Sequence, residues 1–249
     1  LCTALYYAKE TEMNDVKIEG TGRIEAGEYG SVKVDGVARC DGEMRAESLH
    51  VDGIFRSRGN LRAVRMDCDG IVRVRGSLQA DVLGVDGVLR VEGNLKTGSL
   101  DLDGMATVDG NISAGQMTVD GLLTVRGGTK IEATKICCDG MIRLDGEISA
   151  DSIDADGLIR AREIVGETVR IQSRRPGLFA FFMRRSSRIP LIEATTVELR
   201  GVSAETVNGK DVSIGRGCRI ERLDCSGTLR IARGAKVKTI AGEYTLHEA

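Results

Sequence analysis

The residues best suited to bind a surface or partner lie together in one segment, residues 173–190, which reads SRRPGLFAFFMRRSSRIP. It combines basic with large apolar side chains, and the docking residues it predicts are Arg174, Arg175, Leu178, Phe179, Phe181, Phe182, Met183, Arg184, Arg185 and Arg188. An anionic leaflet attracts each arginine by about 1 kcal/mol, and aromatic rings insert into the interface. We therefore expect contact with the inner face of the cytoplasmic membrane. Docking of a protein, or folding back onto the molecule's own flank, are the alternatives.

Residue types for catalysis or metal binding are scarce. The only histidines are His50 and His247, no Cys-x-x-Cys spacing occurs, and the seven cysteines include the adjacent pair Cys137 and Cys138. An odd number of cysteines with an adjacent pair does not suit a disulfide framework, so we expect a reduced, cytoplasmic protein without a zinc site. We expect no catalytic residue and no cofactor. A β-helical acyltransferase with His50 as its base is the enzymatic alternative.

A repeat of 17 residues organises the rest of the chain. One series of Asp-Gly pairs begins at Asp35, Asp52, Asp69, Asp86, Asp103, Asp120, Asp139 and Asp156, with steps of 17 residues except for one of 19. In the unit 87–103, GVLRVEGNLKTGSLDLD, apolar or small residues occupy positions 3, 5, 9, 11, 14 and 16 when the glycine is position one. Alternation of this kind predicts three short strands in each unit, with those six positions facing inward.

One such unit is too small to enclose its own apolar side chains, so neighbouring units must stack. We expect an all-β fold, a right-handed parallel β-helix (solenoid) with a three-sided apolar core and about twelve turns of about 17 residues. The predicted segments are a flexible tail over 1–14, regular β-helix over 15–172, an inserted loop over 173–190, further β-helix over 191–240 and a tail over 241–249. The glycines, 32 of 249 residues, are expected to supply positive φ at the corners.

Two outward columns carry charge. Position four is arginine in six units, at Arg39, Arg56, Arg73, Arg90, Arg143 and Arg160, which leaves a monomeric rod that binds a polyanion or a protein as an alternative. We expect no nucleic-acid partner, because the net charge of the chain is −2. The aspartates before each glycine supply one carboxylate per turn, too few for a calcium site, and Asp-Gly is common turn chemistry.

The repeated runs VKVDG, LHVDG, LGVDG and MTVDG, with the C-terminal run DVSIGRGCRIERLDCSGTLRIARGAKV, resemble the bactofilins, polymer-forming cytoskeletal proteins of bacteria. The resemblance covers residues 16–240. It implies a right-handed β-helix that assembles end to end without nucleotide and positions other proteins, often at the membrane. The partners it implies are further copies of the chain, the membrane and a protein cargo. This chain departs from the family in having about twice as many turns and short tails.

Overall fold

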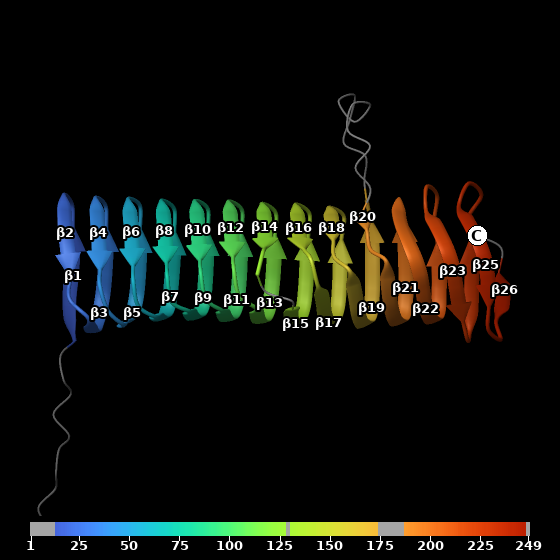
Figure 1. Cartoon of the computed structure of the whole chain (residues 1–249), viewed down its shortest axis with the longest axis horizontal. Coiled ribbons are helices and arrows are strands. Elements are labelled where there is room, and N and C mark those ends of the chain that lie inside the picture. Colours follow the sequence, from blue (N-terminus) through green and yellow to red (C-terminus); the bar gives the residue numbers. More distant parts are fainter. Residues whose placement is uncertain (1–12, 128–129, 174–186, 248–249) are drawn as a thin grey trace, which may run out of the picture.

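The computed structural model describes residues 13–127, 130–173 and 187–247, and these form a straight rod of 26 strands without a helix (Figure 1). Each regular turn contains one short and one long strand, which gives about 13 turns. The short strands are β2 (Thr21–Ile24), β4 (Val37–Cys40), β6 (Ile54–Ser57), β8 (Ile71–Val74), β10 (Val88–Val91), β12 (Met105–Val108), β14 (Leu122–Val125), β16 (Met141–Leu144), β18 (Leu158–Arg160) and β20 (Ser187–Arg188).

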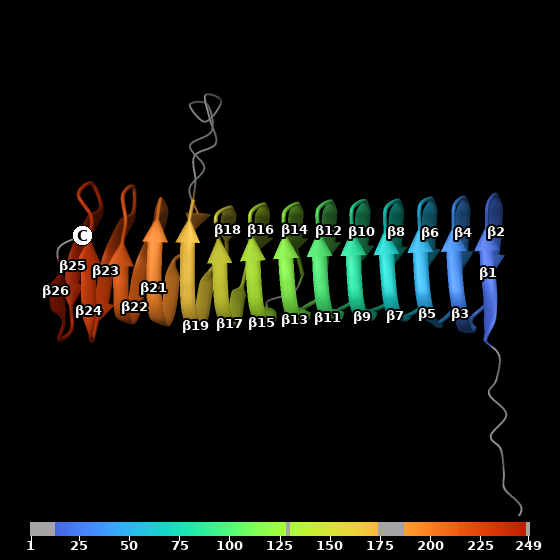
Figure 2. The same ribbon diagram turned by 180° about the vertical axis from the view of Figure 1, so that it is seen from behind.

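The long strands alternate with the short ones along the chain. They are β1 (Asn14–Ile18), β3 (Gly27–Val34), β5 (Met44–Val51), β7 (Leu61–Cys68), β9 (Leu78–Val85), β11 (Leu95–Leu102), β13 (Ile112–Val119), β15 (Lys130–Cys138), β17 (Glu147–Ala155), β19 (Glu163–Gln172) and β21 (Leu191–Arg200). The last turns contain β22 (Val202–Ile214), β23 (Arg219–Cys225), β24 (Thr228–Ile231), β25 (Lys236–Ala241) and β26 (Thr245–His247). Seen from behind, the same order of turns runs along the rod without a break (Figure 2).

Neighbouring turns pair in parallel and in the register of the repeat. Leu95 of β11 pairs with Leu78 of β9 on one side and with Ile112 of β13 on the other. Equivalent residues therefore stack in columns along the rod, because a step of one turn equals a step of one repeat. The predicted parallel β-helix and its 17-residue turns are confirmed.

The apolar core is one continuous column of side chains inside the coil. In the unit 87–103 the apolar inward residues are no more than 1% exposed, and Thr97, the polar exception, is 5% exposed. Its hydroxyl donates a hydrogen bond to the Ser99 carbonyl at 2.8 Å. All six predicted inward positions are thus correct. The long strand supplies two sides of the coil by bending in its middle, where alternation of buried and exposed residues is interrupted at Gly98 and Ser99.

The corner glycines are needed for a different reason from the expected one. None of the Asp-Gly glycines adopts a positive φ; that conformation occurs instead at glycines such as Gly201 and Gly217. A Cβ on Gly104 would lie 2.1 Å from the carbonyl oxygen of Gly87 in the preceding turn. The expectation of positive φ at these corners was wrong, since the close approach of stacked backbones excludes a side chain.

The regular coil extends further than the sequence predicted. Ser187–Arg188 forms β20, which pairs with β18 and β22, and Ile189 is fully buried, so the predicted inserted loop ends four residues too late. At the C-terminal end β26 pairs with β24, inside the predicted tail. The right-handed sense of the β-helix stays a prediction from the spacing of the inward positions.

The corner contact makes a testable prediction about stability. Gly104→Ala should lower the free energy of unfolding by at least about 2 kcal/mol, because its Cβ is forced against a backbone carbonyl that has no room to move. Gly20→Ala is the control, since nothing lies within 4 Å of that Cβ. Urea unfolding followed by circular dichroism measures both, and equal midpoints would contradict the steric account.

Candidate functional site

The inserted segment is anchored in the wall of the coil by two serines. Ser173 Oγ lies 2.8 Å from Ser187 Oγ, and Ser187, which is fully buried, accepts a hydrogen bond from the Ile159 amide at 3.1 Å. The Ser173 amide donates to the Arg200 carbonyl at 2.9 Å. The chain therefore leaves and re-enters the coil at one corner. Nine of the ten predicted docking residues, from Arg174 to Arg185, lie outside the described residues.

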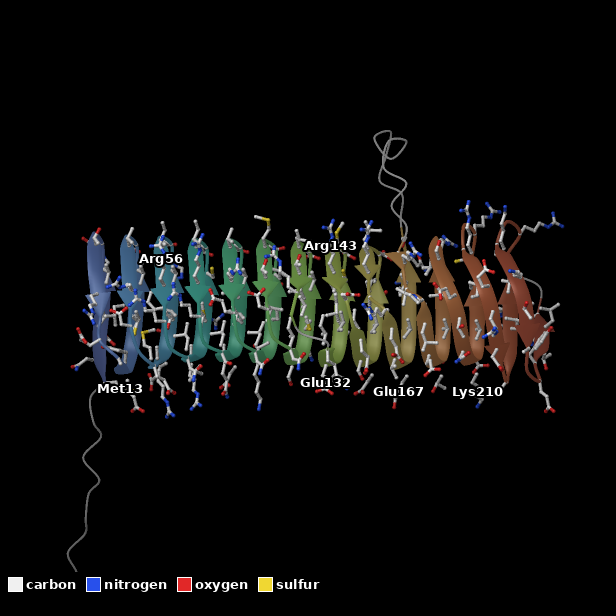
Figure 3. The ribbon with its side chains drawn as sticks, in the orientation of Figure 1. Met13, Arg56, Glu132, Arg143, Glu167 and Lys210 are labelled. Carbon is white, nitrogen blue, oxygen red and sulfur yellow. The ribbon has the colours of Figure 1, made fainter. Side chains whose placement is uncertain are left out.

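The tenth predicted docking residue, Arg188, belongs to a column of cations that runs along the rod. It is exposed in β20, pairs with Arg160 of β18, and occupies position four of its turn. We name this column the arginine ladder; its members are Arg23, Arg39, Arg56, Arg73, Arg90, Arg143, Arg160, Arg188, Arg219 and Lys236. Arg56 and Arg143 are labelled toward the upper edge of the rod in Figure 3, with Glu132 and Glu167 at the lower edge.

Some members of the arginine ladder are neutralised by acids of the next corner. Arg39 and Arg90 form ion pairs with Asp41 and Asp109, at 3.2 and 3.0 Å. Arg56 and Arg73, in contrast, form no ion pair with any residue that the structure describes. The ladder is thus only partly neutralised within the described chain.

Directly beside the arginine ladder lies a column of apolar residues that the sequence reasoning missed. We name it the apolar stripe; it consists of the position-two residues Val37, Ile54, Ile71, Val88, Met105, Leu122, Met141 and Leu158. All eight are exposed or half-buried, with 51% of Met105 and 37% of Ile71 accessible. Positions three and five face inward, so position two must face outward. Because position two is apolar in all eight units, the sequence contained the signal for an exposed apolar column.

The other neighbour of the apolar stripe is the column of corner aspartates, which we name the acidic corner: Asp35, Asp52, Asp69, Asp86, Asp103, Asp120, Asp139 and Asp156. Its ends are partly neutralised, by Lys33 at one end and by Arg170 at the other. From Asp86 to Asp139 no corner aspartate forms an ion pair within the described chain. Loss of hydration raises the pKa of Asp69, and Asp86 and Asp52 raise that pKa further against the opposing effect of His50.

His50 and two corner aspartates form the one metal-ligand cluster among the described residues. The Nε2 atom of His50 lies 3.2 Å from Asp52 Oδ2 and 3.7 Å from Asp69 Oδ2, and all three ligand atoms are within 4.8 Å of one another. One imidazole nitrogen and two carboxylates suit a divalent transition ion. The three side chains stand on an open wall, however, and exposed charged clusters of this kind are common without an ion.

A shallow groove lies near the C-terminal end of the rod. It has a volume of about 760 Å³ and is lined by Arg188, Pro190, Ser203, Ala204, Glu205, Thr206, Arg219, Glu221, Arg222, Lys238 and Thr239. Acids partly neutralise its cations, as in the Lys238–Glu221 pair at 3.0 Å. Neither His50 nor His247 is among the residues that line the groove.

Five of the described cysteines lie inside the coil. Cys40, Cys68, Cys138, Cys218 and Cys225 are buried on inward columns, and Cys137 is half-buried on the outside. Burial raises the pKa of the Cys68 and Cys138 thiols to about 12. These two thiols are therefore protonated at neutral pH and serve as small apolar residues.

Comparisons with protein-family models, with curated proteins and with solved structures found no match. The resemblance to the bactofilins stays a prediction from the sequence motifs. Over the described residues, no helix has the length and apolar character that crossing a bilayer requires.

The thiol environments predict a pattern of chemical labelling. Alkylation of the native protein at pH 8.5 should modify Cys137 and leave Cys68 and Cys138 unmodified, because their pKa of about 12 keeps the reactive thiolate rare and the coil blocks access. Labelling in urea is the control, in which all three should react. Peptide mass spectrometry reads the result, and rapid native labelling of Cys68 would contradict its burial.

Proposed function

We propose that this protein is a non-enzymatic structural rod that assembles end to end, without nucleotide, into a scaffold that positions other proteins. The resemblance to the bactofilins points the same way. The supporting observation is that the two end turns of the described coil carry free strand edges with matching columns. A free parallel edge over apolar side chains is a template for another chain.

At the N-terminal end, β1 and β2 each pair on one side only, with β3 and β4, among the residues that the structure describes. Val16 and Ile18 are half-buried there, although the same columns are fully buried one turn further on. At the C-terminal end, Leu246 of β26 is 65% exposed while its neighbour Leu229 is fully buried. Both end turns therefore expose apolar surface that another turn would cover.

The two ends fit one another in register. Val16 begins a column of inward apolar residues that continues turn by turn to Leu246. A second copy placed with its first turn on this last turn would set its Val16 over Leu246. Main-chain hydrogen bonds of the parallel ladder would then continue from one copy to the next.

Charge at the end turns should stop this assembly. The wild-type protein is expected to form filaments, and Val16→Asp/Leu246→Asp is expected to remain dispersed, because each contact would bury unpaired carboxylates. Val64→Asp is the matched control, since Val64 is 55% exposed on a side wall. Electron microscopy and sedimentation measure assembly. A wild-type protein that stays monomeric at all concentrations and salts would refute the proposal and favour a monomeric binding rod.

We also propose that the inserted segment docks this scaffold on an anionic membrane. Its five arginines and three phenylalanines occur without an acid, and Ser187, which bonds to Ser173, is followed directly by Arg188 of the arginine ladder. Basic and aromatic residues in one segment suit an anionic lipid interface.

Liposome flotation tests the docking segment. Phe179→Ser/Phe181→Ser/Phe182→Ser should lower recovery with anionic vesicles about tenfold or more, because three apolar rings no longer insert. Val64→Ser, which removes an exposed apolar side chain elsewhere on the rod, should float like the wild type. Equal recovery of the triple variant and the wild type would remove membrane contact from the proposal.

A further inference from the structure

One side of the rod presents three columns in a fixed order: the acidic corner, the apolar stripe and the arginine ladder. In the turn that contains β8, these are Asp69, Ile71 and Arg73. The order repeats through eight consecutive turns, from β4 to β18, with arginine in six of them. Figures 1 and 2 show these short strands as one uninterrupted side of the rod.

The apolar stripe has no cover within the described chain. Eight rungs at a strand spacing of about 4.8 Å make it about 35 Å long, and its most exposed member, Met105, is 51% accessible. Scattered apolar residues on a surface are ordinary, but a contiguous column bordered by charges marks an interaction site. The charges on its two sides have opposite sign, which restricts what the partner can be.

We infer that this side of the rod binds the same side of a second copy, with the two rods parallel. A two-fold axis along the rods preserves their direction and exchanges the left and right edges of the face. The apolar stripe then meets its own copy, and the arginine ladder of each rod lies opposite the acidic corner of the other. Antiparallel rods would instead set acid against acid and arginine against arginine, which like-charge repulsion disfavours.

The spacing of the columns suits this arrangement at every turn. Both ladders advance by one strand spacing per turn, so Arg56 and Arg73 of one copy lie level with Asp52 and Asp69 of the other. Facing sheets pack about 10 Å apart, a gap that stripe side chains from both copies fill. Burial of the stripe supplies the stabilisation. The exposed ion pairs, each worth at most about 1 kcal/mol, set the direction of pairing.

The acidic corner argues against an anionic membrane as the occupant of this face. A lipid surface that attracted the arginine ladder would meet a parallel column of eight carboxylates on the other side of the apolar stripe. Negative surface potential repels those carboxylates along the full length of contact. A second copy satisfies both columns at once.

Cross-linking of single cysteines tests the pairing and its direction. The variants are built in the end-blocked chain Val16→Asp/Leu246→Asp, so that failure of lateral pairing is distinct from failure of end-to-end assembly. Cys2 and Cys137 are replaced by serine to remove other reactive thiols. In parallel rods each rung faces its own copy, so Ile71→Cys and Met105→Cys should each give a covalent dimer with a short bis-maleimide.

Control positions make the outcome decisive. Val64→Cys, on a different side of the coil, should remain monomeric. Antiparallel rods would cross-link at one of the two stripe positions at most, because only rungs near the crossing point face their own copy. That result, or monomers at both positions, would overturn the proposal.

Charge reversal gives an independent test. Arg56→Asp/Arg73→Asp and Asp52→Arg/Asp69→Arg should each weaken the lateral dimer about tenfold or more, and an equimolar mixture of the two should restore it as a heterodimer. Analytical ultracentrifugation measures the dimer, with circular dichroism as the folding control. Absence of rescue would overturn the pairing. A second result would also overturn it. If the end-blocked chain without charge reversals stays monomeric and binds phosphatidylglycerol vesicles by its apolar stripe, the face binds lipid and not a second copy.

Discussion

The contact between backbones of successive turns is the constraint on which this structure depends. At the corners from Asp35 to Asp139 the aspartate and glycine amides donate to one carbonyl oxygen of the preceding turn; Asp103 and Gly104 both donate to Val85, at 3.0 and 2.9 Å. The opposite corner is tied by polar side chains, since Asn94 Oδ1 accepts from the Asn111 amide at 2.9 Å. These bonds hold successive turns in register, and a carbonyl this close requires glycine. They recur at each step of the 17-residue repeat.

Equal turns also determine what the surface looks like. Equivalent positions of successive turns lie one strand spacing apart, so a residue type that recurs at one position forms a column along the rod. The acidic corner, the apolar stripe and the arginine ladder arise in this way. Over the described residues the protein therefore presents extended columns of similar side chains along its sides.

The sequence predicted the inward columns because the alternation around Leu95 and Leu100 is strict and repeats without drift. It did not predict the reason for glycine at Gly104, since a positive φ and a backbone clash select the same residue. The apolar stripe was missed because its residues directly precede an inward apolar residue, as Val88 precedes Leu89, so an exposed apolar side chain is hidden in the sequence beside a buried one. Ser187 was assigned to the insertion because a polar residue at an inward position conceals the register of β20.

The anchoring of the insertion has a consequence for how such proteins diversify. Pairing of β19 with β21 continues in register from Glu163 and Leu191 onward, although 28 residues separate them in place of the usual 17. Extra chain that enters and leaves at one corner leaves the hydrogen bonding above and below it intact. Any turn is thus a potential carrier for a foreign peptide. Over evolutionary time a rod of this type could acquire different recognition segments at chosen heights without redesign of its interior.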